Sequence, residues 1–429
     1  MNKVFKLEER GTTVRKEIVA GLTTFLTMAY ILAVNPGLLS AAGMNASSVF
    51  TATALSAAIA TLVMAFSANL PFALAPGMGL NAFFAFTVVL GMGASIEMAL
   101  TAVFVEGIVF IILSFFNVRE AIIKAIPENL KKAVAVGIGL FIAFIGLQGA
   151  GIIVANDATV VSLGTVNSGT ALVALLGLAI TAVLYALKVP GSILIGILVT
   201  TIIGIPFGVT TIPENWAPFA APSAPLWFHF DFSHIFTLQF FTVFFTFFFV
   251  DIFDTVGTLV GVSHEAHLED KNGDIPRVKQ ALLSDAIGTV AGACLGTSTV
   301  TTYVESSAGV AAGGRTGLTS LTTGVMFLLA LVLSPIFLLI PGAATAPALI
   351  LVGFFMMQAV IDIDFKDPTE GIPAFMAIIM MPLAYSIAEG IVWGIITYVV
   401  MKVFTKKAKQ IPVITWVLFV IFILRIIFA

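Results

Sequence analysis

The sequence predicts an all-α membrane protein that crosses the bilayer many times, and three observations support this prediction. Of its 429 residues, 59% are hydrophobic and only 10% are charged, and the mean hydropathy is +1.10. Water-soluble domains carry about 25% charged residues, so a soluble enzyme of this length is excluded. Hydrophobic stretches as long as a helix that crosses a bilayer, roughly 20 residues, recur throughout the chain.

These stretches form two sets of seven, one in residues 18–208 and the other in residues 235–403. The first set covers approximately 18–36, 49–68, 75–91, 96–116, 131–154, 170–187 and 188–207. The second set covers approximately 235–262, 278–296, 297–313, 317–341, 345–361, 372–385 and 386–403. Because seven is odd, the second set enters the membrane in the opposite orientation. This predicts fourteen transmembrane segments in a 7+7 inverted repeat, an architecture of secondary transporters.

Positive charge assigns the loops to a side of the membrane. Residues 1–17 carry both signs of charge and lack the apolar core of a signal peptide, so we expect a cytoplasmic leader. The positive-inside rule then places further basic loops in the cytoplasm, those that contain Arg119, Lys124, Lys131, Lys132, Lys271, Arg277 and Lys279. Residues 209–234 contain no Lys or Arg and are expected to form an extracytoplasmic loop.

The C-terminal residues 404–429 combine a basic turn with an apolar helix. The lysines of this turn lie on the cytoplasmic side only if residues 372–403 form two short helices folded as a hairpin, and we expect that hairpin. Residues 411–429 then either cross the membrane once more or lie on its cytoplasmic face.

The third stretch of each set differs from a plain membrane helix. Residues 71–86 place two prolines and two glycines before a helical run, and residues 296–314 place a Thr/Val stretch before a Gly-rich one. Extended backbone at membrane depth is tolerated only inside protein or beside a cavity. We therefore expect elements 3 and 10 to be broken, with short extended stretches that pair with each other and a half-helix from each that starts at one central site.

Acidic residues inside the hydrophobic stretches are the candidates for function, because a carboxylate at membrane depth costs about 2.5 kcal/mol or more. Six acids occupy such positions: Glu106, Asp251, Asp254, Asp285, Glu305 and Glu389. Asp254 and Thr258 share one helix face, with Asp251 one turn earlier, and Glu305 lies at the break of element 10. We expect Asp254 and Glu305 to converge. The structural alternatives are an interhelical hydrogen bond for Asp254 and a helix cap for Glu305.

The other candidates have stronger structural alternatives. Asn81 follows the break in element 3 and offers an amide that donates and accepts, or else it caps the half-helix. For Asp251 we favour a role in orienting Asp254 or the backbone of element 3. The acids Glu106, Asp285 and Glu389 lie in the middle of a stretch without a broken helix nearby, so interhelical hydrogen bonding is at least as good an interpretation for them.

Three long segments resemble the signature segments of the AzgA-like purine permeases, which belong to the nucleobase–ascorbate transporter superfamily with the uracil permease fold. These segments read APGMGLNAFFAF, FVDIFDTVGTLVGV and TTYVESSAGVAAGGRTGLTS. The resemblance implies a core domain from elements one to four and eight to eleven, and a gate domain from the others. It also implies that Asp254, Glu305 and Asn81 bind the base. Where uracil carriers of this superfamily have a histidine, this chain has Thr258, which favours the purine branch.

The resemblance implies an importer of hypoxanthine, guanine and adenine in the cell membrane, driven by proton symport with alternating access. A purine is planar and edged with N–H donors and ring acceptors, so two carboxylates and an amide suit its edge, and Phe83 and Tyr303 suit its faces. Asp254, Glu305 and Asp251 are the candidates for proton coupling. We expect no cofactor other than the coupling proton. We also expect contact with membrane lipid, and a homodimer is left open.

Other functions find less support in the sequence. A carrier of xanthine, uracil or another small solute in the same fold is the main alternative. An anion carrier would need a cation near the midplane, and the spans that hold the six acids contain no Lys, Arg or His away from their ends. An ion channel is disfavoured by the inverted repeat. No metal-ligand or nucleophile constellation indicates an enzyme, and the net charge of −3 gives no footprint for nucleic acid.

Overall fold

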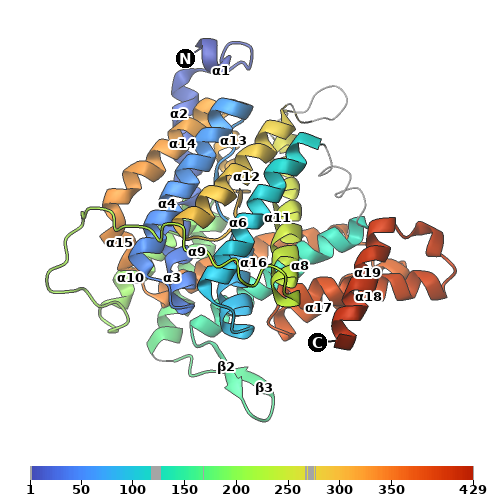
Figure 1. The fold of residues 1–429 in the computed structure, drawn as a ribbon. Coiled ribbons are helices and arrows are strands. Elements are labelled where there is room, and N and C mark those ends of the chain that lie inside the picture. The colour runs from blue at the N-terminus through green and yellow to red at the C-terminus, as the bar shows by residue number, and fades with distance from the viewer. Residues whose placement is uncertain are drawn as a thin grey trace. The chain divides into compact units, whose positions relative to one another are not determined.

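The computed structural model describes residues 2–116, 127–167, 169–265, 268, 275 and 277–428, and these residues are mostly helical (Figure 1). Three basic residues that were placed in cytoplasmic loops, Arg119, Lys124 and Lys271, lie outside the described residues. The chain divides into two units. Unit 1 consists of residues 1–114 and 146–348, and unit 2 consists of residues 115–145 and 349–429.

The elements of unit 1 are mainly helices with two pairs of short strands. Up to residue 116 they are α1 (Asn2–Phe5), α2 (Val14–Met28), α3 (Ile31–Ala41), α4 (Ala46–Val63), the π-helix η1 (Met64–Ala68), β1 (Leu74–Pro76), α5 (Met78–Ala82), the π-helix η2 (Phe83–Gly91) and α6 (Ile96–Phe116). Next come β2 (Ile153–Asn156), β3 (Val160–Leu163), α9 (Gly169–Ala186), α10 (Ser192–Gly204), α11 (Leu238–Glu265) and α12 (Val278–Leu295). The last are β4 (Val300–Thr302), α13 (Ser306–Ala311), α14 (Gly317–Ala330), the 3₁₀ turn η3 (Leu331–Leu333) and α15 (Ser334–Leu338).

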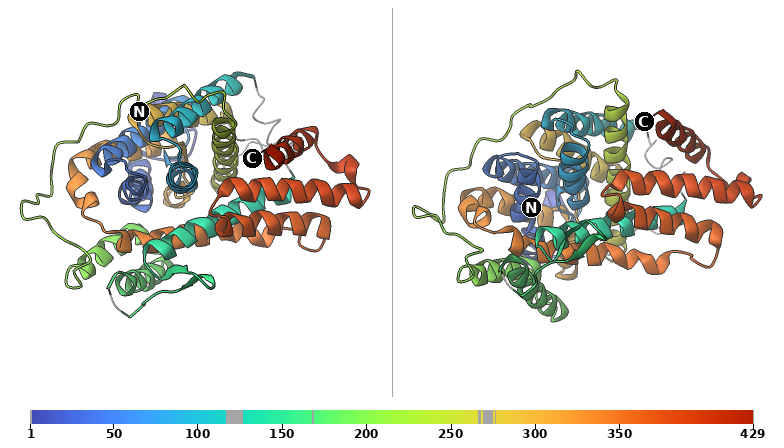
Figure 2. Two further views of the ribbon diagram at one scale, coloured as in Figure 1. Left: turned by 60° about the horizontal axis from the view of Figure 1, so that its bottom comes forward. Right: turned by 90° about the horizontal axis from the view of Figure 1, so that it is seen from below.

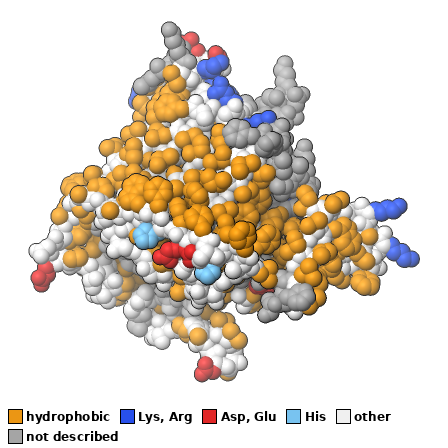
Figure 3. Space-filling model, viewed as in Figure 1, with side chains coloured by type: hydrophobic (Ala, Val, Ile, Leu, Met, Phe, Trp, Pro, Cys, Tyr) orange, Lys and Arg blue, Asp and Glu red, His pale blue; other side chains and the backbone are white. Residues whose placement is uncertain are grey.

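Eight helices among the described residues are long and apolar enough to cross a bilayer, and five further apolar helices are shorter. This confirms the prediction of a multi-pass membrane protein. Figure 3 shows hydrophobic side chains over a broad area of the visible surface, as expected for a surface that contacts lipid. The count of fourteen crossings stays a prediction, because several predicted segments form short or interrupted helices.

The two broken elements pair with each other, as the sequence predicts. Strand β1 pairs antiparallel with β4, with Leu74 opposite Thr302 and Pro76 opposite Val300. Backbone hydrogen bonds extend the pairing at both ends, from the Tyr303 amide to the Ala73 carbonyl and from the Gly77 amide to the Thr299 carbonyl. These hydrogen bonds satisfy backbone N–H and C=O groups that would otherwise be unpaired at membrane depth. We call this paired region the β1–β4 crossing.

Glu17 links α2 to α14 through hydrogen bonds, which the sequence does not predict. Its buried carboxylate accepts hydrogen bonds from the backbone amides of Arg315, Thr316 and Thr319, and from the hydroxyls of the two threonines. A carboxylate at the start of a helix satisfies amides that have no partner within the helix. Residues 14–17 of the predicted leader therefore form the first turn of α2 and belong to the packed unit.

Helices α9 and α10 lie in unit 1, whereas the resemblance assigns them to the gate domain. The reason is their apolar contacts with other parts of unit 1. Ala171 and Val173 of α9 share a buried cluster with Ala343 and Ala346. Ahead of α10, Gly191 adopts a left-handed backbone conformation (φ +71°) and packs directly against Leu26 of α2.

The predicted extracytoplasmic loop, residues 209–234, contains no helix or strand and runs over unit 1 as a long trace in Figure 1. Hydrogen bonds fix it at intervals. The Trp216 indole donates to the Pro335 carbonyl at 3.1 Å, the Phe228 amide donates to the Cys294 carbonyl, and the Asp231 amide donates to the Thr101 hydroxyl. The loop is therefore an ordered part of unit 1 although it has no regular structure.

Unit 2 consists of helices joined by tight turns. Its elements are α8 (Glu128–Gly149), α16 (Gly342–Met357), the 3₁₀ turn η4 (Gln358–Asp362), α17 (Pro368–Leu383), α18 (Ile387–Phe404), the 3₁₀ turn η5 (Ala408–Gln410) and α19 (Val413–Phe428). The last residues of α8, 146–149, and the first residues of α16, 342–348, belong to unit 1. The predicted hairpin is confirmed, because α17 and α18 lie side by side in both views of Figure 2. Helix α19 packs back on α18 through a cluster that contains Tyr398, Val399 and Ile411.

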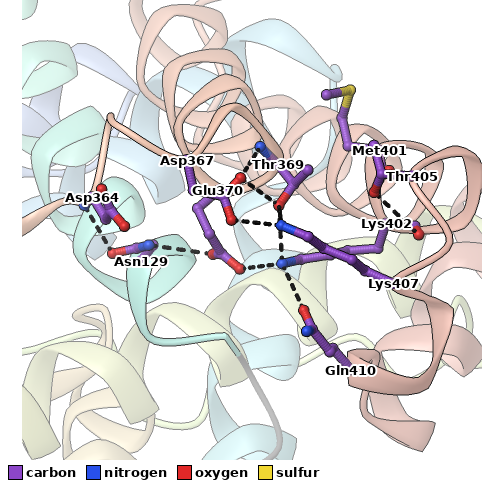
Figure 4. Close-up of polar contacts among 10 residues, drawn as sticks. All are labelled: Asn129, Asp364, Asp367, Thr369, Glu370, Met401, Lys402, Thr405, Lys407 and Gln410. Atoms are coloured by element: carbon purple, nitrogen blue, oxygen red, sulfur yellow. Dashed lines mark hydrogen bonds and ion pairs between the residues drawn. The ribbon is translucent and has the colours of Figure 1, made fainter.

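Polar side chains join the turns at one end of this hairpin (Figure 4). Lys402 of α18 is buried and forms an ion pair of 2.6 Å with Glu370 of α17. Lys407, in the turn after α18, forms a second ion pair of 2.8 Å with Asp367, the residue that caps the N-terminus of α17. Glu370 also accepts from the Asn129 amide of α8 at 3.3 Å. We call these five residues the unit 2 ion cluster.

Candidate functional site

The candidate site lies in unit 1, beside the β1–β4 crossing. Asp254 projects from α11 and is half-buried, and its Oδ2 accepts a hydrogen bond of 3.1 Å from the Thr301 hydroxyl of β4. Thr301 is itself held in the strand pair opposite Ala75. The β1–β4 crossing therefore helps to fix the position of this carboxylate.

Glu305 approaches the same point from the end of the crossing. Its Oε1 accepts a hydrogen bond of 2.6 Å from the Tyr30 hydroxyl, and its backbone carbonyl is 3.4 Å from the Thr27 hydroxyl. Although Glu305 directly precedes α13, its side chain makes no capping hydrogen bond to that helix. The helix-cap alternative for Glu305 is therefore wrong, because the carboxylate is directed to the first hydrophobic segment.

The two acids are brought together, as the sequence predicts. Asp254 and Glu305 interact electrostatically with each other and with the phenols of Tyr30 and Tyr303. The Tyr303 hydroxyl donates to the Pro76 carbonyl of β1, so its ring is tied to the opposite strand. Two carboxylates and two phenols thus gather on one side of the crossing.

Asn81 and Phe83 lie on the helix that follows β1. Asn81 is buried, its Nδ2 donates to the Pro76 carbonyl at 3.3 Å, and its Oδ1 accepts from the Ser298 hydroxyl. The residue that caps α5 is Gly77, so the capping alternative for Asn81 is wrong. Phe83 is buried with its ring edge-to-face against Phe247 of α11, at a centroid distance of 4.9 Å.

Thr258 and Asp251 share α11 with Asp254 but differ in surroundings. Thr258, one turn after Asp254, is half-buried. Asp251 is fully buried and accepts from the Thr255 hydroxyl at 3.2 Å, and the same hydroxyl lies 2.7 Å from Oδ1 of Asp285 on α12. Asp251 is therefore joined through Thr255 to α12, and its expected role in orienting Asp254 or the backbone of element 3 stays a prediction.

Two other acids occupy different positions from those expected. Glu106 of α6 is buried and accepts a hydrogen bond of 2.7 Å from the Thr299 hydroxyl, directly before β4, so a broken element does lie beside it. The sequence could not reveal this, because which helix crosses element 10 is a tertiary property. Glu389 lies in the first turn of α18, after the capping residue Ser386, and not in the middle of a segment.

Several polar residues of the site have no signal in the sequence. Tyr30 and Thr27 belong to the first hydrophobic segment, in TMAY, and Thr301 and Ser298 belong to a run of hydroxyl residues. A tyrosine in the interior of a membrane helix, away from the interfacial positions that tyrosine favours, was the one available hint. Among the described residues, no group of three His, Cys, Asp or Glu side chains has the geometry of a metal site.

This arrangement can accept hydrogen bonds at membrane depth. Among the described residues, the carboxylates of Asp254 and Glu305 each accept a hydrogen bond from one hydroxyl donor. A carboxylate can accept several hydrogen bonds, so each group can also accept from the N–H groups of a ligand. The paired strands beside them fix both acids relative to the same backbone.

Comparisons with known proteins agree with this description. A sequence profile of the permease family matches residues 15–393. The chain is 47% identical to the guanine/hypoxanthine permease PbuG of Bacillus subtilis, over all of both chains, and 45% identical to the adenine permease AdeP of Escherichia coli, over all of this chain and 96% of that one. Both relatives are permeases and not enzymes.

A solved structure shows the same fold at low sequence identity. The transmembrane domain of the cyanobacterial bicarbonate transporter BicA superposes with a TM-score of 0.65, is 16% identical, and covers 87% of this chain and 97% of its own. At this identity the likeness concerns the fold alone. The family profile and the two relatives, each matched over nearly its whole length, decide the family. The chain belongs to the permease family of multi-pass membrane proteins, as a member of its nucleobase–ascorbate transporter group.

Proposed function

We propose that this protein is a secondary active transporter that imports the purine nucleobases hypoxanthine, guanine and adenine by proton symport with alternating access. The observation that carries the proposal is the pair of carboxylates, Asp254 and Glu305, each anchored by a hydroxyl beside the β1–β4 crossing. Relatives that match over the whole chain are named as adenine and guanine/hypoxanthine permeases, which supports the choice of substrate.

The chemistry of the site suits a purine edge. A purine at neutral pH is uncharged and presents ring N–H donors, which a carboxylate accepts strongly. Asp254 and Glu305 are the proposed acceptors, with Thr258 next to Asp254 on the same helix. Asn81 supports the site from α5, and Phe83 and Tyr303 are the proposed aromatic contacts for the base. A buried site that hydrogen-bonds its ligand rejects molecules that lack the matching groups.

Proton coupling is the second part of the proposal, with Asp254, Glu305 and Asp251 as the candidate carriers and no other cofactor. Thr255 offers one hydroxyl proton to two buried carboxylates, those of Asp251 and Asp285. One additional proton on Asp251 or Asp285 would let the Thr255 hydroxyl accept from one carboxyl group and donate to the other. Repulsion between two close carboxylates favours binding of such a shared proton. Coupling follows if the base and the proton each bind better when the other is present.

We also propose a topology for this function. It has fourteen segments in a 7+7 inverted repeat, with the N-terminus in the cytoplasm, residues 209–234 outside and the protein in the cell membrane. The basic residues at the α18–α19 turn, Lys406, Lys407 and Lys409, support a cytoplasmic position for that turn. The association state, including a homodimer, would follow from mass measurement in a lipid nanodisc.

Uptake of labelled hypoxanthine into cells that lack their own purine carriers tests the proposal. We expect Asp254→Asn and Glu305→Gln each to reduce concentrative uptake at least 10-fold while the protein still reaches the membrane, because an amide cannot replace a charged acceptor or carry the proton. Asp157→Asn and Glu214→Gln, at exposed loop acids, are the matched controls. Normal uptake by either site variant would reject the assignment.

Two further arms of this experiment define substrate and ion. Unlabelled hypoxanthine, guanine and adenine should compete with the labelled base, and stronger competition by xanthine or uracil would assign the alternative substrate class. Collapse of the proton gradient should abolish accumulation. Accumulation that survives this collapse and rises with added sodium would contradict proton coupling.

A further inference from the structure

We propose that Tyr30 is a positioning residue of the substrate site, which acts by fixing the carboxylate of Glu305. This inference rests on the proposed function, and it adds the first hydrophobic segment to the elements that determine how the base is bound. Its starting point is the hydrogen bond of 2.6 Å from the Tyr30 hydroxyl to Oε1 of Glu305. The two residues are 275 positions apart in the sequence and belong to different halves of the predicted repeat.

The backbone places Tyr30 where the first segment is interrupted. Helix α2 ends at Met28 and α3 begins at Ile31, so Tyr30 lies in the joint between two helices. Its side chain is only 1% exposed, and packing therefore fixes the position of the ring. A fixed ring holds the phenol oxygen in place, and the Glu305 carboxylate lies within hydrogen-bond distance of it.

The strength of this contact depends on the hydroxyl and not on the ring. Hydrogen bonds from a hydroxyl to a carboxylate are short, about 2.5–2.7 Å, and roughly twice as strong as neutral ones. The carboxylate of Glu305 has three rotatable bonds between it and the backbone, and its position would otherwise vary. Because Oε1 is held by Tyr30, Oε2 keeps one orientation, in which it can accept from the base.

A second contact from the same segment supports this role. The Thr27 hydroxyl lies 3.4 Å from the Glu305 carbonyl, although it also donates to the carbonyls of Thr23 and Thr24 at shorter distances. Both the side chain and the backbone of Glu305 therefore face the end of α2. Gly309 of α13 also packs closely against Thr24 and the Ala20 carbonyl, so the end of the crossing and α2 form one packed unit.

Electrostatics connects Tyr30 with the rest of the site. Its phenol interacts with Glu305, Tyr303 and Asp254, the three groups that the proposed function uses on this side of the crossing. A phenol that packs only for structure has no need of a carboxylate partner, and phenylalanine would fill the same volume. The hydroxyl is thus the part of Tyr30 whose removal isolates the positioning role.

The variant Tyr30→Phe tests the inference, with the purified full-length protein for binding of labelled hypoxanthine and with cells for uptake. We expect the Kd for hypoxanthine and the KM for uptake to rise about 10- to 100-fold, because the Glu305 carboxylate would no longer be held in the orientation that accepts from the base. The maximal uptake rate per transporter should stay within about threefold. Tyr185→Phe on α9, where the ring is 42% exposed, is the matched control.

The outcomes separate this inference from the proposed function. If the unmodified protein binds and transports no purine, the proposed function fails. If the unmodified protein binds hypoxanthine and Tyr30→Phe binds it with the same Kd, the inference fails while the proposed function stands. A lower maximal rate at unchanged KM would assign the hydroxyl to a step after binding and would also overturn the inference.

Discussion

The buried ion pair of unit 2, Lys402 with Glu370, leads to a prediction about stability that depends on which partner is removed. Lys402 has 3% of its side chain exposed, whereas Glu370 has 21% exposed. Among the described residues the ammonium group has three further neighbours. Two are the Thr369 hydroxyl and the Gln410 amide oxygen, both at 3.1 Å (Figure 4). The third is the ring of Tyr398, whose centroid is 5.4 Å away. All three neighbours are neutral.

The magnitudes follow from this difference in exposure. Glu370→Gln leaves a buried ammonium without its counter-charge, and breaking such a pair costs about 3–5 kcal/mol, of which we expect about 3 because Glu370 is partly solvated. Lys402→Met leaves a carboxylate that keeps Asn129 and some water, so we expect a cost of about 1 kcal/mol. The double variant removes both charges and should lie within about 1 kcal/mol of the Lys402→Met variant.

Thermal unfolding of the purified protein in one detergent measures the order of these effects. Glu370→Gln should melt lowest, Lys402→Met higher, and adding Lys402→Met to Glu370→Gln should raise the melting temperature again. Lys409→Met, at an exposed lysine of η5, is the matched control and should change little. A double variant that melts below both single variants would refute the reasoning, because the charges would then not be each other's main partner.

Two other predictions concern unit 2. Asp367 has a pKa below its ordinary value, because its carboxylate accepts from Lys407 and from Thr369. Because the pKa of Asp367 is lowered in the folded state, its contribution to stability is complete above the unfolded pKa of about 4 and declines as the pH falls below that value. The difference in melting temperature between the unmodified protein and Asp367→Asn should therefore shrink on acidification and in high salt. A difference that does not depend on pH would contradict this. Gly353→Ala should destabilise by about 1–3 kcal/mol in thermal unfolding, because its new Cβ would meet the Gly139 carbonyl and the Ala143 Cβ, whereas Gly149→Ala, which meets no atom within 4 Å, should not.

Hydropathy and helix breakers were sufficient to predict the main features of the fold. The hydrophobic stretches predicted a multi-pass helical protein, and the prolines and glycines of residues 71–86 with the Thr/Val run of residues 296–314 predicted the two broken elements that pair as β1 and β4. The basic turn after residue 403 predicted the α17–α18 hairpin. These features depend on local composition, and hydropathy read from the sequence indicates which segments lie out of water.

Contacts between distant polar side chains were not predictable in the same way. Glu17 lies in a segment whose charges suggest solvent, yet its partners begin 298 residues later. Serine and threonine hydroxyls have no periodic signal, because in membrane helices many of them bond to the backbone one turn earlier, as Thr53 and Thr181 do here. The sequence therefore identified the acids at membrane depth but not the hydroxyls that hold them.

The type of partner that holds these acids bears on the proposed proton coupling. The described contacts join Asp254 to Thr301, Glu305 to Tyr30, Glu106 to Thr299, and Asp251 and Asp285 to Thr255. A hydroxyl donates to an ionised carboxylate and accepts from a protonated one, whereas an ammonium or guanidinium group bonds well only to the ionised form. Hydroxyl partners therefore allow a carboxyl group to gain and lose a proton without leaving a buried polar atom unpaired. In unit 2, where Glu370 is paired with Lys402, a change of protonation would instead leave a buried cation without its partner. These five acids of unit 1 thus have surroundings suited to a proton that comes and goes, and Glu370 of the unit 2 ion cluster has surroundings suited to a permanent charge.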